Sequence, residues 1–327
     1  MEPSISSAEL PAFPRLLFGR HQGYDLREQW ITKGLLALAG AEHLTARARL
    51  FVFPDATDRF GIGPGMVAAL RYWLRATGLM VEQTASKAGR HVPALTPLGS
   101  LLAQHDPYLQ HSGSLWLLHA HLARSLLLAP TFYWFFQCFV GTTPFTKEEC
   151  LQALLSWAIK DAPSQRIAPE VLRKDLECLL RIYTHQPQHT TPEQAVLASP
   201  FRRLRLLQCA STGPSVSGVG APTRRGGMSY VLCSPQAGEI PPLVVLALIL
   251  EQNQAVPRVP LTHLLYRQTY IGRTSCLKQG TLLHALQRLQ EGVPDWCPRS
   301  SRVDEQEWMI LPSVPAERVL PQYYQQP

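Results

Sequence analysis

The chain has 327 residues and a formal net charge of +7, with 46% hydrophobic and 17% charged residues. This length is sufficient for two or three compact units, and the hydrophobic content excludes a wholly disordered chain. Of the 31 basic residues 25 are arginine, the side chain best suited to bidentate phosphate contacts, so the composition is compatible with a polyanionic partner. GC-rich coding would favour arginine equally well. The excess positive charge lies in residues 201–327, which hold 13 basic and 8 acidic side chains.

The cysteines and the apolar segments bear on the compartment of the protein. Seven widely spaced cysteines without a Cys-x-x-Cys pair argue against a disulfide framework or a structural zinc site. We predict no signal peptide, because the N-terminus lacks a basic segment followed by an apolar one. The apolar stretch 115–140 contains three basic or histidine side chains and is broken at Pro130, which favours two buried helices over a membrane span. We therefore expect a soluble, cytoplasmic protein that does not interact with a membrane.

The first third of the chain has the element order of a winged helix-turn-helix. The pattern predicts a helix over 26–40, a short apolar segment at 50–55, a glycine-rich turn at 61–65 and an amphipathic helix over 66–79. Two strands joined by a loop follow, and then a helix capped by Thr96. In a winged helix-turn-helix the second helix enters the major groove of DNA and the wing contacts phosphates, although such units also serve as protein–protein modules.

This arrangement selects the candidate DNA-binding residues. Arg71 and Arg75 lie four residues apart on one face of the predicted second helix, and Lys87 and Arg90 lie in the predicted wing. A low-complexity segment at 211–227 is predicted to be a mobile loop and carries two further candidates, Arg224 and Arg225.

The remaining segments are predicted to be mainly helical. Thr146 and Glu149 have the spacing of a capping box, and a second amphipathic helix is predicted over 167–183. Beyond residue 228 the pattern predicts a strand at 229–235 and another within 304–313. Between them it predicts three helices, at 242–252, 260–267 and 277–290. Three helices followed by a strand suggest a second winged-helix-like unit.

The predicted fold class is therefore mainly α with small β wings. We expect a winged-helix-like domain at 1–110, a helical domain at 111–210, a flexible loop at 211–227 and a C-terminal helical or winged-helix-like domain at 228–327.

The turn at Gly61, Gly63 and Gly65 is chemically suited to cradle a phosphate at a helix N-terminus, but a simple need for glycine torsions explains it better. It is neither a Walker nor a Rossmann motif.

Catalytic and metal-binding patterns are sparse. His119 and His121, which lie two apart on a predicted helix, are better explained as structural histidines than as metal ligands. No recognisable nuclease or hydrolase motif is present, and Asp106 is the one acid that we select as a metal-linked catalytic candidate.

Several segments resemble one bacterial protein family in their order and spacing. They are residues 18–35, 61–79, 94–99, 106–122, 132–139, 145–149, 173–183 and 199–207. The chain resembles the domain-of-unknown-function family that is encoded beside phosphoadenosine-phosphosulfate-reductase-like proteins in DNA phosphorothioation and phage-defence operons. The family includes an Ssp-type DNA nickase component.

The resemblance implies a DNA-linked role with defined partners. It implies double-stranded DNA as substrate, Mg²⁺ or Mn²⁺ as cofactor, and a phosphoadenosine-phosphosulfate-reductase-like protein, a cysteine desulfurase and an ATPase as partners. Two departures put nicking in question. Pro64 and Gly65 stand where the family has Lys-Asn, and Gln110 stands where it has Glu.

Three functions are compatible with the sequence. The first is a DNA-binding component of a phosphorothioation-type defence system that also nicks DNA for sulfur insertion. The second is a non-enzymatic adaptor for the sulfurtransferase or ATPase partner. The third is a winged-helix transcriptional regulator, which would usually bind its operator as a homodimer.

Overall fold

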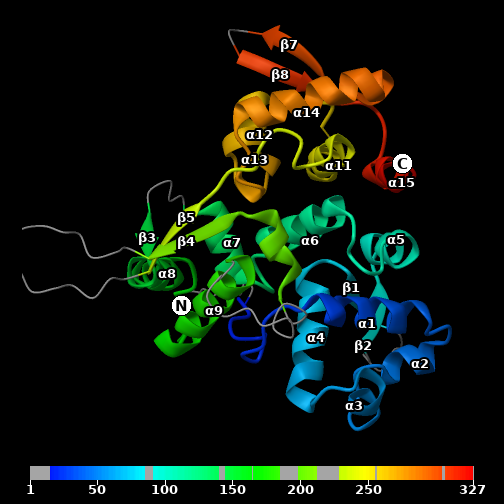
Figure 1. Ribbon diagram of the computed structural model, residues 1–327, viewed down its shortest axis with the longest axis vertical. Coiled ribbons are helices and arrows are strands. Elements are labelled where there is room, and N and C mark those ends of the chain that lie inside the picture. The colour runs from blue at the N-terminus through cyan, green and yellow to red at the C-terminus, as the bar shows by residue number, and fades with distance from the viewer. Residues whose placement is uncertain are drawn as a thin grey trace, which may run out of the picture.

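The computed structural model describes residues 15–84, 91–139, 144–163, 165–184, 198–211, 228–254, 256–303 and 306–326. The described residues are mainly helical and contain three small antiparallel sheets, which confirms the predicted class of an α protein with small β elements (Figure 1). The C-terminal elements lie at one end of the molecule and the first four helices at the other, with α6 and α7 between them.

The N-terminal elements comprise five helices and one hairpin. The helices are α1 (Glu28–Ala39), α2 (Leu44–Arg49), α3 (Asp55–Phe60), α4 (Pro64–Ala76) and α5 (Pro97–His105). The hairpin pairs β1 (Met80–Thr84) with β2 (His91–Leu95). Thr96 caps α5 as predicted, because its Oγ1 accepts a hydrogen bond from the Gly99 amide at 2.9 Å. Helices α2 and α3 were not predicted; six residues are too few to show a helical period.

The middle elements confirm the break in the long apolar stretch. Helix α6 (Ser112–Arg124) and helix α7 (Pro130–Gln137) are separate and short. No helix among the described residues has both the length and the apolar character needed to cross a membrane. The capping box at the start of α8 (Lys147–Asp161) is also confirmed, since Glu149 Oε2 accepts from the Thr146 amide at 2.8 Å and Thr146 Oγ1 accepts from the Glu149 amide at 3.2 Å.

A three-stranded sheet lies beside α8 and α9 (Pro169–Tyr183). Its strands are β3 (Phe145–Thr146), β5 (Met228–Leu232) and β4 (Leu207–Ser211) in that order, and the short helix η2 (Pro200–Leu204) precedes β4. The strand predicted at 229–235 is therefore present as β5. It pairs with strands on the N-terminal side of the segment 211–227, at whose end we expected a domain to begin.

The C-terminal elements combine helices with a second three-stranded sheet. The helices are α11 (Pro242–Gln252), α12 (Leu261–Tyr266), α13 (Ile271–Thr274), α14 (Gln279–Gly292), η3 (Pro294–Trp296) and α15 (Ala316–Tyr324). The strands are β6 (Arg258–Pro260), β8 (Gln306–Ile310) and β7 (Arg299–Val303), in the order β6-β8-β7. The three predicted helices and the last predicted strand are confirmed, whereas β6, β7, α13 and α15 were not predicted.

Helix α6 is joined to α9 and to the C-terminal helix α13 through a buried histidine. His119 is fully buried, with Nε2 2.8 Å from the Thr274 carbonyl oxygen and Nδ1 2.6 Å from the Tyr183 hydroxyl. Because a carbonyl can only accept, Nε2 carries the proton and Nδ1 accepts from Tyr183. Burial lowers the pKa of His119 to about 4, so the ring is neutral at pH 7. The prediction that His119 is a structural histidine is confirmed.

A buried carboxylate fixes the first described residues to the middle helices. Asp175 on α9 accepts hydrogen bonds from the Gly19 amide at 3.0 Å, from His21 Nε2 at 2.8 Å and from Thr131 Oγ1 at 3.1 Å. These donors replace the water that the carboxylate loses on burial.

We predict that the stability of the protein falls on acidification because of His119. Its pKa is lower in the folded chain than the ordinary value of 6.5, so the unfolded chain binds the extra proton first and stability is lost as the pH falls below 6.5. The loss between pH 7 and pH 5 should be about 2 kcal/mol from this residue. Urea unfolding at both pH values measures it. A His119→Gln variant should be less stable at pH 7 but should lose less on acidification; an equal loss in both proteins would contradict the assignment.

Candidate functional site

The glycine-rich turn forms the link between α3 and α4. Gly61 ends α3 with a φ of +63°, a conformation that favours glycine, and Gly63 is the N-cap of α4. A Cβ added at either residue would meet no atom within 4 Å, so only the torsion at Gly61 requires glycine. A Cβ at Gly65 would lie 3.3 Å from the Tyr24 ring. The turn leaves the first turn of α4 exposed, but Pro64 removes one of the amide donors that an anion would use.

Helix α4 carries Arg71 and Arg75, the two arginines selected from the sequence. Their side chains lie in different surroundings. Arg71 Nε lies 2.8 Å from Glu82 Oε1 on β1, and the Arg71 side chain is 40% exposed. Arg75, one turn later, lines a cavity at the far end of the helix. The opposite face of α4 is buried in the core through Val67, Leu70 and Trp73.

The other predicted DNA-binding residues, Lys87, Arg90, Arg224 and Arg225, lie outside the described residues. The strands β1 and β2 on either side of Lys87 and Arg90 pair as the sequence predicted.

Asp106 lies at the N-terminal end of α6 and is 3% exposed. Its Oδ1 accepts from the Gln110 amide at 2.7 Å, and its Oδ2 accepts from the His111 amide at 3.0 Å and from the Ser114 hydroxyl at 2.5 Å. Asp106 is the C-cap residue of α5, so these contacts hold the segment between α5 and α6 against the first turn of α6. Gln110 contributes its backbone amide to this contact, which a glutamate would contribute equally.

The C-terminal helix α15 covers the N-terminal end of α6. The Tyr323 hydroxyl accepts from the Gly113 amide at 3.0 Å, and the Tyr324 hydroxyl lies 2.8 Å from Ser114 Oγ. The His105 ring stacks on Tyr324 with centroids 5.5 Å apart. No local pattern in the sequence predicts this contact, because the two segments are about 210 residues apart.

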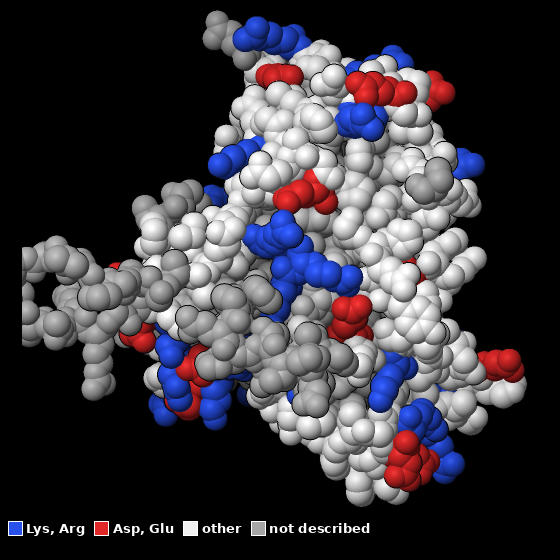
Figure 2. All heavy atoms as spheres, viewed as in Figure 1, with Lys and Arg blue, Asp and Glu red and all other residues white. Residues whose placement is uncertain are grey.

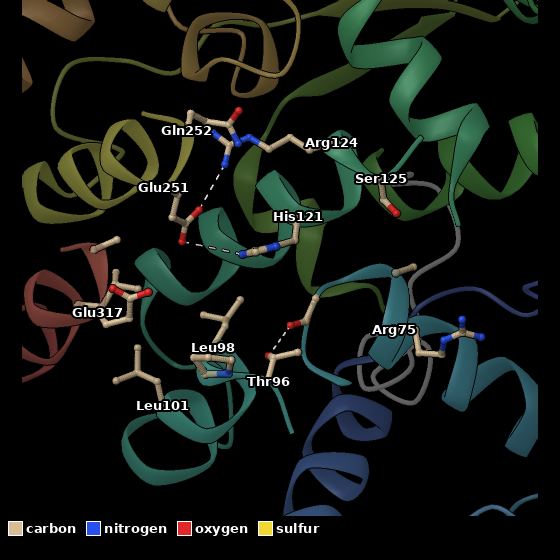
Figure 3. A pocket seen from close by; sticks show the side chains of 15 residues that line it. Arg75, Thr96, Leu98, Leu101, His121, Arg124, Ser125, Glu251, Gln252 and Glu317 are labelled. Atoms are coloured by element: carbon tan, nitrogen blue, oxygen red, sulfur yellow. Dashed lines mark hydrogen bonds and ion pairs between the residues drawn. The ribbon is translucent and has the colours of Figure 1, made fainter. Parts of the chain in front are cut away.

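A cavity of about 560 Å³ lies where α4, α5, α6, α11 and α15 meet (Figure 3). Leu98, Leu101 and Leu320 supply much of its apolar wall. Arg124 and His121, both on α6, point toward Glu251, whereas Arg75 points away from them.

Charges inside the cavity are largely paired. Arg124 Nη1 lies 3.3 Å from Glu251 Oε2, and Arg124 Nε donates to the Thr269 carbonyl at 2.8 Å. Burial lowers the pKa of Arg124 to about 10 and raises that of Glu251, so Arg124 stays charged at pH 7. His121 Nε2 is buried without a hydrogen-bond partner, 4.0 Å from Glu251 Oε1. With Arg75 and Glu317 also in the lining, the cavity has two side chains of each sign and favours neither anions nor cations.

Metal binding finds little support among the described residues, where no group of three His, Cys, Asp or Glu side chains is placed to hold an ion.

The distribution of charged side chains over one face of the molecule bears on DNA binding. Lys and Arg side chains gather near the middle of one face, with Asp and Glu beside them, and others are spaced over both ends (Figure 2). The positive charge seen on this face is therefore distributed and does not form one stripe.

The fold and these surfaces define a mainly helical protein with three small antiparallel sheets and buried charges that are largely paired. The chain belongs to a family of proteins of unknown function, DUF4007, whose sequence profile matches residues 18–324. This confirms the resemblance seen in the sequence.

Two solved structures share the fold. The magnesium ion-bound SspB crystal structure has a TM-score of 0.77 and 23% sequence identity to this chain. The match covers 94% of this chain and 88% of the SspB chain. A second SspB crystal structure has a TM-score of 0.74 and 22% identity with the same coverage. No curated protein matches the chain.

We predict that Gly78→Ala destabilises the protein at this cavity. Gly78 has a φ of +75°, and an added Cβ would lie 2.7 Å from His121 Cγ. Backbone strain and displacement of His121 should together lower the free energy of unfolding by about 2 kcal/mol or more. Gly63→Ala is the matched control, because Gly63 has an ordinary φ of −66° and open space, and should lower stability by about 1 kcal/mol or less through its N-cap position alone. Urea denaturation compares the two; equal effects would contradict the analysis.

Proposed function

We propose that this chain is a DNA-binding component of a bacterial DNA phosphorothioation-type modification and phage-defence system. The observation that carries the proposal is the structural likeness to SspB over 94% of the chain. Membership of the DUF4007 family agrees with the resemblance seen in the sequence and supports it. The sequence identity of 23% supports a shared fold, and DNA binding and nicking are open to direct measurement.

The proposal divides the chain into a winged-helix domain at 1–110, a helical domain at 111–210, a loop at 211–227 and a second winged-helix-like domain at 228–327. Helices α3 and α4 with the hairpin β1–β2 support the first winged helix. Helices α11, α12 and α14 with the sheet order β6-β8-β7 support the second winged-helix-like domain. The short strand β6, which follows α11, pairs with β8 of the hairpin formed by β7 and β8.

In this proposal the basic side chains contact DNA phosphates. The assigned residues are Arg71, Arg75, Lys87, Arg90, Arg224 and Arg225. Arg71 is held by Glu82 and partly exposed, so its guanidinium keeps free N–H groups for a phosphate beside the ion pair. The turn at Gly61, Gly63 and Gly65 would place backbone amides near the same strand of DNA.

Nicking of DNA is the finer form of this proposal. It would need a divalent metal or another means of activating water, and the described residues assemble no such group. Asp106 is engaged by three hydrogen bonds, so its role in the described structure is to hold the segment that connects α5 to α6. We therefore derive no metal-dependent step from these residues.

One observation favours the adaptor as a second candidate function. Three apolar side chains of the α2–α3 region, Leu44, Val52 and Phe53, are 55%, 52% and 67% exposed. Exposed apolar side chains of this size are typical of protein contacts. The sulfur-transferring enzyme, the cysteine desulfurase or the ATPase of the same system would be the partner.

We predict duplex DNA binding that weakens steeply with salt. Each phosphate contact contributes a slope of about −0.9 to the dependence of log K on log salt concentration. Arg71→Ala combined with Arg75→Ala should reduce the slope by about 2 in a fluorescence-anisotropy titration. Arg173→Ala combined with Lys174→Ala removes two exposed charges from α9 and should leave the slope unchanged. Absence of wild-type binding at low salt would overturn the proposal.

We predict that any nicking activity survives the Asp106→Asn substitution, because Asp106 holds the connection between α5 and α6. Supercoiled plasmid is incubated with the protein, its operon partners and Mg²⁺ or Mn²⁺, and open-circular product is measured on a gel. The variant should lower stability by about 1 to 2 kcal/mol without abolishing product. Plasmid that stays supercoiled with the wild-type protein under both metals removes nicking from the proposal, and selective loss in the variant would contradict our assignment of Asp106.

A further inference from the structure

Helix α14 presents a polar face that no other described element covers. Its buried stripe consists of Leu282, Ala285, Leu286 and Leu289. The side chains on the opposite face are exposed: Gln279, Leu283, His284, Gln287, Arg288, Gln290 and Glu291. Spacings of three and four positions within this set place them side by side along the helix.

Helix α4, which we expected from the sequence to contact DNA, exposes far fewer polar side chains than α14. Among its residues only Pro64, Gly65 and Ala68 are classed as exposed, and none of these has a side chain that donates or accepts hydrogen bonds. Arg71 is partly exposed and bound to Glu82. Helix α4 is therefore suited to contact a phosphate at its edge, whereas reading bases requires polar side chains that project from the protein.

The charge around α14 is favourable for DNA. Lys278 is exposed and precedes the helix, Arg288 lies on its polar face, and Arg302 is exposed on β7. The one acid on α14 is Glu291, in the last turn, where it lies 3.5 Å from Arg288 with both side chains more than half exposed. A pair this exposed is weak and leaves Arg288 available to another anion.

The type of side chain on this face also matters. Glutamine and histidine both offer hydrogen bonds to base edges, and lysine and arginine bind phosphates. A helix of 14 residues is about 21 Å long, and the major groove of B-form DNA is about 12 Å wide, so a single helix fits within it.

We infer that the exposed face of α14 is the surface that enters the major groove of duplex DNA, with Gln279, His284 and Gln287 facing the base edges and Lys278 and Arg288 facing phosphates. This inference rests on the proposed function and adds to it the element that makes the groove contact. The sequence between β7 and β8 contains Asp304 and Glu305, which would repel phosphates.

The test measures binding of the full chain to a 30-base-pair duplex by fluorescence anisotropy over a range of salt concentrations. Lys278→Ala combined with Arg288→Ala should weaken binding at least 10-fold and reduce the salt slope by about 2. His284→Ala combined with Gln287→Ala should weaken binding with little change in slope. All four positions are exposed, so the variants should keep the wild-type circular dichroism spectrum and urea midpoint. The control is again Arg173→Ala with Lys174→Ala, which should bind within twofold of the wild type.

The groove is tested separately by competition. Methyl green, which occupies the major groove, should displace the protein, and netropsin, which occupies the minor groove, should not. Wild-type binding that is lost in the Arg71 and Arg75 variant but unchanged in both α14 variants would overturn this inference and leave the proposed function standing. Displacement by netropsin alone would also overturn it. A wild-type protein that does not bind duplex DNA would overturn both.

Discussion

The burial of α6 is the constraint on which the rest of the structure depends. Ten of its 13 residues are buried, so this helix can exist only when other elements surround it. Its polar side chains must then find partners inside the protein, and they find them far along the chain. His119 bonds Thr274, Arg124 bonds Thr269 and Glu251, and Trp116 donates to the Glu239 carbonyl. These bonds hold the C-terminal elements against the middle of the molecule.

The same constraint gives the buried acids partners inside the protein. Asp106 and Asp175 accept hydrogen bonds from amides, hydroxyls and a histidine, and Glu251 is bound to Arg124. Groups committed in this way have little capacity left for a metal or a substrate. Helix α14 covers the core with one face, so polar side chains on its other face remain exposed.

Much of the local structure followed from local signals. Thr146 with Glu149, Thr96 and Gly40 marked the ends of helices, and the break at Pro130 divided an apolar stretch that otherwise resembled a membrane span. The elements that were not predicted are those with the weakest local signals. Strand β6 has three residues and needs β8 beside it, and α2 and α3 have six residues each and pack against β2 and α4, respectively.

The sequence by itself determined the helical class, the principal helix limits, the family and the arginine-rich charge, because each depends on residues close together or on composition. Only the tertiary structure decided which polar groups are free. Asp106 was a reasonable catalytic candidate until Ser114, Tyr324 and two amides were placed around it, and Arg71 was a free cation until β1 brought Glu82 within 2.8 Å. Hydrogen bonds and ion pairs form between side chains that packing brings together, and the order of residues along the chain does not specify which side chains those will be.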